Sequence, residues 1–194
     1  MIRSKTRGVE FIDINTDAQD LHAALASKKL HIGKNVTRGL GAGMNPDLGR
    51  QAGEESKREI EETLRGADMV FITCGFGGGT GTGAGPIVAE LAKAQGALAV
   101  AVVTKPFSFE GELRKRIAEE GLARLRKCVD AMIVIPNDRI LNIVERDTPM
   151  LAAFAMCDEV LRQAVEGIAD LIITPGIINV DFADVRTILQ NSGS

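Results

Sequence analysis

The chain has 194 residues, which is enough for one α/β domain with a sizeable core but short for two full domains. Apolar residues make up 45% of it, with no Tyr and no Trp, so the core must be built from aliphatic side chains, as in a buried parallel sheet flanked by helices. The net charge of −3, without a dense basic run, excludes extensive nucleic-acid binding and attachment to an anionic membrane.

The cysteines and histidines exclude further classes. Three cysteines lie far apart in the sequence, which argues against a disulfide scaffold or a zinc site. Only His22 and His31 are available for a metal centre or a Ser-His-Asp triad. No signal-peptide core and no long apolar stretch occur, so we expect a cytoplasmic protein without direct membrane insertion.

The elements alternate along the chain. In chain order, strands are predicted over residues 9–14, 30–32, 68–74, 97–104, 131–135 and 171–174. Helices are predicted over 18–26, from 46 to about 65, over 84–95 and 110–127, and from about 149 to 167. This alternation predicts a Rossmann-like, doubly wound parallel sheet, in which ligands bind in the loops at the carboxyl ends of the strands.

The strongest sign of a ligand is a glycine-rich loop between a predicted buried strand and a helix. It consists of Gly77, Gly78, Gly79, Thr80, Gly81, Thr82 and Gly83. Glycines let backbone N–H groups approach an anion, the helix adds its positive end, and the threonines add hydroxyl groups, as a phosphate cradle requires. A turn that serves only tight strand–helix packing needs fewer glycines.

Other phosphate loops fit this segment poorly. The lysine of the P-loop is missing, because no Lys or Arg occurs between Cys74 and Glu90. A dinucleotide-binding loop also needs an acid about 20 residues further on to hold the ribose, and the chain there reads Val103, Thr104, Lys105. A nicotinamide-dependent enzyme is therefore disfavoured.

Two weaker features accompany this loop. A second glycine-rich stretch, residues 39–43, also precedes a predicted helix and would form another wall of the same phosphate site. Asp181 and Asp184 lie three residues apart behind Asn179, at a predicted helix start. Acids at such positions commonly cap helices, and they can also orient or deprotonate a water molecule. Their spacing leaves both roles open.

These motifs together resemble the bacterial tubulin-like cell-division GTPases of the FtsZ type. The loop from Gly77 to Gly83 resembles the tubulin-family signature, and residues 179–185 resemble the catalytic loop of the division GTPases. Segments 15–19, 37–43, 103–107, 109–111 and 135–138 match in the same order. The likeness extends from about Gly8 to Arg186.

The resemblance implies a GTP-binding, GTP-hydrolysing protein that associates head to tail into filaments at the division site. The implied cofactors are GTP or GDP and Mg²⁺, the ion carried mainly by the nucleotide. The implied contacts are Gly77 to Gly83 on the α- and β-phosphates, Ala42, Gly43 and Asp17 near the γ-phosphate, Thr104, Pro106, Glu110 and Arg114 on the ribose, Asn137 on ribose or base, and Phe154 and Asp158 on the guanine. Asp181, Asp184 and Asn179 would act on the GTP of the next subunit.

The chain departs from the family pattern at both ends. Family members have a strand and another glycine-rich loop before the segment that matches Ile2 to Phe11. We therefore expect a GTP-binding domain over residues 1–181 that is incomplete at its amino end, with residues 182–194 starting the helix toward a missing second domain. Other division proteins would bind through regions outside this chain. The alternatives are that another chain fills the gap, or that a non-catalytic fragment binds or caps filaments of intact partners.

Overall fold

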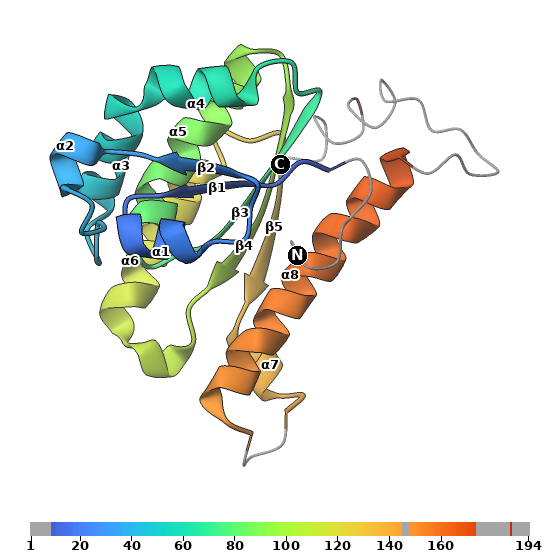
Figure 1. Cartoon of the computed structure of the whole chain (residues 1–194). Coiled ribbons are helices and arrows are strands. Elements are labelled where there is room, and N and C mark those ends of the chain that lie inside the picture. The colour runs from blue at the N-terminus through green and yellow to red at the C-terminus, as the bar shows by residue number, and fades with distance from the viewer. Residues whose placement is uncertain (1–8, 145–147, 174–186, 188–194) are drawn as a thin grey trace.

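The computed structural model describes residues 9–144, 148–173 and 187 (Figure 1). The strands are β1 (Ile12–Asn15), β2 (Lys28–His31), β3 (Met69–Gly75), β4 (Leu98–Lys105) and β5 (Ala131–Pro136). The helices are α1 (Ala18–Ala23), α2 (Lys34–Thr37), α3 (Pro46–Glu55), α4 (Lys57–Leu64), α5 (Thr80–Ala94), α6 (Glu112–Leu125), α7 (Asp138–Leu141) and α8 (Met150–Ile173), with a 3₁₀ turn at Ser108–Glu110. Within the described part of the chain, no helix is long and apolar enough to cross a membrane.

The strands form two parallel sheets rather than one. β1 pairs with β2, and a separate sheet has the order β3-β4-β5, with every pair parallel. Among the described residues, β1 and β3 are not paired with each other. The parallel α/β class predicted from the sequence is confirmed.

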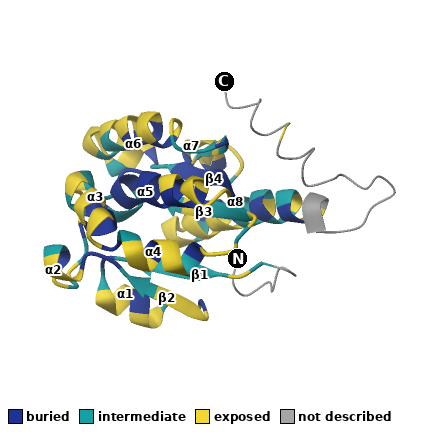
Figure 2. Cartoon of the chain, turned by 90° about the horizontal axis from the view of Figure 1, so that it is seen from above, coloured by how far each residue is buried: buried dark blue, intermediate teal, exposed yellow. Residues whose placement is uncertain are grey.

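The larger sheet is covered on both faces, because side chains of β4 alternate between two cores. Leu98, Val100 and Val102 pack with Leu161 and Val165 of α8. The intervening side chains of β4 pack with α5 and α6. Figure 1 shows α8 on one side of these strands and α5 with its neighbours on the other, and α5 is almost wholly buried (Figure 2). This is the doubly wound arrangement.

Helices α3 and α5 approach each other closely at glycines. A Cβ atom at Gly83 would lie 2.1 Å from the carbonyl oxygen of Pro46, and one at Gly49 would lie 2.1 Å from the carbonyl oxygen of Gly79. Only hydrogen fits at either position without moving a backbone. The contact therefore fixes the start of α3, and the loop before it, beside the start of α5.

The long helix predicted from 46 to about 65 is two helices. The break lies at Ser56, whose backbone leaves the helical region with φ −101° and ψ 16°. The buried Ser56 hydroxyl oxygen accepts a hydrogen bond from the N–H of Gly33 at 3.0 Å. A serine that satisfies a buried backbone donor of another segment explains why the chain turns here.

The strand predicted over 171–174 is wrong for the residues that the structure describes, because α8 continues to Ile173. The helix buries one residue in every four, at Cys157, Leu161, Val165 and Ala169, and this spacing is helical. Helix α5 begins at Thr80 rather than at 84, so the glycine-rich loop forms its first turn. The predicted domain boundary at 181–182 lies outside the described residues.

Candidate functional site

The start of α5 presents free backbone donors. Within the described chain, the N–H groups of Gly78, Thr80, Gly81 and Thr82 have no hydrogen-bond partner. Three of them belong to the first turn of the helix, where N–H groups lack intrahelical acceptors and the helix dipole is positive. No side chain caps this helix. The arrangement suits an anion, which would accept several of these hydrogen bonds at once.

The two threonines of the loop have different environments. The hydroxyl oxygen of Thr82 accepts a hydrogen bond from the N–H of Gly77 at 3.0 Å, and Thr82 is only 2% exposed. Gly77 has φ +107°, a conformation that favours glycine. The Thr82 hydroxyl oxygen therefore braces the turn from inside.

Thr80 faces the end of β1. Its hydroxyl lies 2.6 Å from that of Thr16, a buried residue immediately after β1. Thr16 was not among the predicted site residues. Thr16 directly follows β1 and directly precedes Asp17, which was predicted. Parallel strands place their carboxyl ends at one edge of the sheet, so this position is the signal that could have identified Thr16.

The second glycine-rich loop lies against the first, as predicted. The N–H of Gly79 donates to the carbonyl oxygen of Gly43 at 2.7 Å. A Cβ atom at Gly79 would lie 2.8 Å from that of Ala42, so the two loops are in backbone contact. Asp17 caps α1, with one carboxylate oxygen accepting from the N–H groups of Gln19 and Asp20. Ala42 and Gly43 thus line the start of α5, and Asp17 directly follows Thr16, whose hydroxyl bonds to that of Thr80 there.

A cavity of about 820 Å³ opens beside Gly78. It collects the residues predicted to contact a ribose and a base, which come from β4, the 3₁₀ turn, α6, the end of β5 and α8. These are Thr104, Pro106, Glu110, Arg114, Asn137, Phe154 and Asp158. Sequence reasoning missed other lining residues, among them Ala24, Leu25 and Gly75. The size is that of a pocket for a ligand of several rings.

The polar side chains of this cavity are partly prearranged. Glu110 accepts a hydrogen bond from the N–H of Phe107 at 2.9 Å and forms an ion pair with Arg114 at 2.8 Å. Asn137 is 5% exposed, and its side-chain oxygen has no hydrogen-bond partner. A buried acceptor without a partner is unfavourable, so a ligand donor at this place would satisfy it.

An aromatic cluster forms one wall. The ring of Phe154 meets that of Phe107 edge-on, with centroids 5.1 Å apart, and Phe107 stacks on Phe109 at 4.8 Å. Phe154 remains 37% exposed. It thus contributes to packing and still offers ring surface to the cavity. Asp158 lies one helical turn further along α8 and is exposed.

The described residues provide no preformed metal centre. No three His, Cys, Asp or Glu side chains in the described ranges gather as metal ligands would. One carboxylate oxygen of Asp17 is used as a helix cap, and the nearby hydroxyls of Thr16 and Thr80 bond to each other. This donor set fits an ion such as Mg²⁺ only where phosphate oxygens and water supply most of the ligands.

The predicted catalytic residues Asn179, Asp181 and Asp184 lie outside the described residues. The structure thus places the predicted nucleotide contacts around one site and says nothing of the water-activating pair.

Comparison with known proteins identifies the family of this chain. Residues 3–145 match the family model described as the Tubulin/FtsZ family, GTPase domain. A solved structure of an empty FtsZ dimer from M. jannaschii is 51% identical, with a TM-score of 0.93 over 97% of this chain and 55% of its own length. A point mutant of M. jannaschii FtsZ gives the same identity and TM-score, over 98% of this chain and 57% of its own.

A more distant structure supports the fold alone. It is the GDP-bound monomer of a CetZ protein from Haloferax volcanii, 22% identical, with a TM-score of 0.76 over 93% of this chain and 54% of its own. The chain therefore spans about half the length of the solved proteins that it matches.

Proposed function

This chain belongs to the Tubulin/FtsZ family, and we propose that it binds GTP between the start of α5 and the 820 Å³ cavity beside it. The observation that carries the proposal is the set of free N–H groups at Gly78, Thr80, Gly81 and Thr82. Of these residues Gly78 lines the cavity, whose lining also includes the ring of Phe154 and the carboxylate of Asp158. Phosphates at the helix and a base at the wall would use both halves of the site.

In this arrangement Gly77 to Gly83 hold the α- and β-phosphates, and the loop with Ala42 and Gly43 faces the γ-phosphate. Mg²⁺ is held mainly by the phosphates, near Asp17, and neutralises their charge. The Glu110–Arg114 pair and Thr104 lie where they can contact the ribose. Backbone donors suit this role because they are fixed in place before the ligand arrives.

We propose that base selection depends on α8. Phe154 stacks on the base, and the Asp158 carboxylate accepts hydrogen bonds from the N1–H and N2 amino group of guanine. Adenine presents an acceptor at N1 and no amino group at C2, so it would leave the carboxylate unpaired. Selectivity for GTP over ATP follows from this difference in hydrogen-bond pattern.

Hydrolysis is proposed to occur between subunits. Asp181 and Asp184, with Asn179, would reach the GTP of the next subunit and orient the attacking water, while the loops around α5 stabilise phosphoryl charge. A head-to-tail contact of this kind does not close on itself and so builds filaments. In the cell we place such filaments in the cytoplasm at the site of division.

The test is titration of the purified chain with a fluorescent GTP analogue and Mg²⁺, competed with GTP and then with ATP. Displacement by GTP, and not by ATP at the same concentration, supports the proposed site. Displacement by both equally would remove the role assigned to Asp158, and no binding at all would overturn the assignment of the cavity. Turnover of GTP is measured separately, alone and with full-length FtsZ added.

A further inference from the structure

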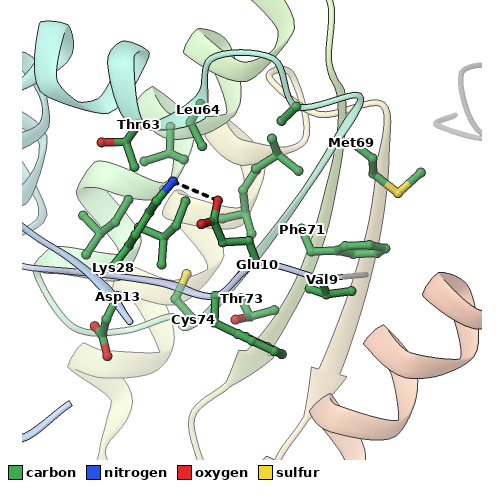
Figure 3. Close-up of a pocket in the computed structure, with 18 of the residues that line it drawn as sticks. Val9, Glu10, Asp13, Lys28, Thr63, Leu64, Met69, Phe71, Thr73 and Cys74 are labelled. Atoms are coloured by element: carbon green, nitrogen blue, oxygen red, sulfur yellow. Dashed lines mark hydrogen bonds and ion pairs between the residues drawn. The ribbon is translucent and has the colours of Figure 1, made fainter. Parts of the chain in front are cut away.

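The side chain of Thr16 connects the end of β1 to the start of α5. β1 and β3 are not paired among the described residues, and a cavity of about 1040 Å³ with Asp13 and Cys74 in its lining borders both strands (Figure 3). After the ends of these strands, the hydroxyl of Thr16 lies 2.6 Å from that of Thr80. This is the distance of a short hydrogen bond between two hydroxyl groups. The contact joins the two segments at the place where phosphates are proposed to bind.

The backbone of Thr16 is held through both of its polar groups. Its N–H donates to the side-chain oxygen of Asn15 at 2.8 Å. Its carbonyl oxygen accepts from the N–H of Gly41 at 3.2 Å and from the hydroxyl of Thr37 at 3.1 Å. The residue is fully buried, and its β-branched side chain has few rotamers to choose from. The Thr16 hydroxyl is therefore a fixed neighbour of Thr80.

The burial of the two hydroxyls decides which of them donates. Each has one proton and can also accept. Among the described residues, Thr80 is the hydrogen-bond partner that the buried Thr16 hydroxyl has. If Thr16 only accepted, its proton would be buried without an acceptor, which is unfavourable. Thr80 is partly exposed in the first turn of α5, so its proton can point to solvent or to a ligand. Thr16 is therefore the donor, and the proton of Thr80 stays available.

We propose that Thr16 is a positioning residue for the bound phosphates, because its hydroxyl donates to that of Thr80 and the Thr80 hydroxyl then donates to a phosphate oxygen. The inference rests on the proposed GTP site, which supplies the ligand of Thr80. The N–H of Thr80 already belongs to the free donors offered to an anion, so one residue would contribute two donors. A hydroxyl that accepts one hydrogen bond donates more strongly in the next. Thr16 thus acts on the ligand through Thr80.

Thr80 is the threonine of the glycine-rich loop whose hydroxyl can serve the ligand. The other, Thr82, is only 2% exposed, and its oxygen is used by the N–H of Gly77. Thr16 also contacts the second glycine-rich loop, through the hydrogen bond from the N–H of Gly41 to its carbonyl oxygen. The orientation of the Thr80 hydroxyl is thereby tied to the position of both loops.

The first experiment tests the direction of the hydrogen bond in the ligand-free chain. NMR of the chain with ¹³C-labelled threonine, in a mixture of water and deuterium oxide, resolves the protonated and deuterated forms of a hydroxyl that exchanges slowly. We expect slow exchange at Thr16, fast exchange at Thr80, and faster exchange at Thr16 in Thr80→Val. Fast exchange at Thr16 in the wild-type chain, or slow exchange that Thr80→Val leaves unchanged, would overturn the proposal.

The second experiment measures affinity for a fluorescent GTP analogue with Mg²⁺. Thr16→Val keeps the shape of the side chain and should weaken binding about tenfold, the lower end of the value of a hydrogen bond to a charged group. Thr16→Ser keeps the hydroxyl and should bind within about threefold of the wild type. The matched control is Thr37→Val, which removes a buried hydroxyl that bonds to the carbonyl oxygens of Thr16 and Gly33. It should lower the urea midpoint and retain affinity.

A double-mutant cycle shows whether Thr16 acts through Thr80. In the Thr80→Val chain, Thr16→Val should weaken binding no further, because the hydroxyl that it positions is already absent. Unchanged affinity of Thr16→Val, an equal loss in Thr37→Val, or a full further loss in the Thr80→Val chain would each overturn the positioning role while GTP binding stands. Absence of GTP binding by the wild-type chain would instead overturn the proposed function, and this inference with it.

Discussion

Substitution of Thr82 tests whether the glycine-rich loop is held in place by its own side chains or by its ligand. Thr82→Val keeps the shape of the side chain and removes the acceptor that the N–H of Gly77 uses at 3.0 Å. A buried donor left unpaired costs about 1–3 kcal/mol. For a chain of this size, each kcal/mol corresponds to about 2–4 °C in Tm. We expect Thr82→Val to lose this amount of stability in the ligand-free protein.

Two variants control for the change of side chain. Thr82→Ser keeps the acceptor and loses one methyl group, which should cost about 1 kcal/mol. Thr63→Val removes a hydroxyl whose partner, among the described residues, is the carbonyl oxygen of Glu59 in its own helix, and should change stability by less than about 0.5 kcal/mol.

The assay is urea unfolding followed by far-ultraviolet circular dichroism, because the chain has no Trp or Tyr to report by fluorescence. Binding of the GTP analogue is measured on the same variants. We expect Thr82→Val to lose both stability and affinity, and Thr82→Ser to retain affinity. Unchanged ligand-free stability of Thr82→Val, together with weakened binding, would refute the bracing role and assign the hydroxyl to the ligand.

Three further predictions concern other parts of the molecule. Asp158→Asn should reduce the preference for GTP over ATP by about 10- to 100-fold, the worth of a hydrogen bond to a charged group, as measured by competition. Gly49→Ala should lower the urea midpoint, since its Cβ would lie 2.1 Å from the carbonyl oxygen of Gly79, whereas Gly167→Ala, in open space on a helix, should raise it slightly. Burial raises the pKa of the Cys74 thiol from 9.0 to about 12. The stability that the protonated thiol contributes is therefore intact below about pH 9 and is lost as the pH rises toward 12. Urea midpoints across this pH range should fall less steeply in Cys74→Ala.

The position of the candidate site could be predicted because it follows from topology. Residues after β3, β4 and β5 must meet at one edge of a parallel sheet, so Gly78, Thr104 and Asn137 come together whatever the details of the loops. Phe154 and Asp158, by contrast, were assigned to the base by the family resemblance. The topological inference needs only the order of the elements.

The rest depended on contacts between distant segments. The break at Ser56 exists because its hydroxyl satisfies Gly33, 23 residues away, and nothing in the local sequence indicates that partner. The hydroxyl of Thr80 faces Thr16, whereas that of Thr82 braces the loop from inside, and this difference depends on where α5 begins. The sequence pattern placed that start at residue 84. The end of α8 was assigned to a strand because a short apolar run suits either a strand or a buried helix.

The division of the sheet also implies unequal local stability. β1 and β2 are short, and outside their own pairing they are held by the Thr16–Thr80 hydrogen bond and by side chains packed on the helices. Such a unit can open without separating β3, β4 and β5. Amide protons of β1 and β2 should therefore exchange with solvent through local opening, while those of β4 exchange only when the whole chain unfolds. We therefore expect amide protection to be higher in β4, the buried central strand of its sheet, than in β1 and β2.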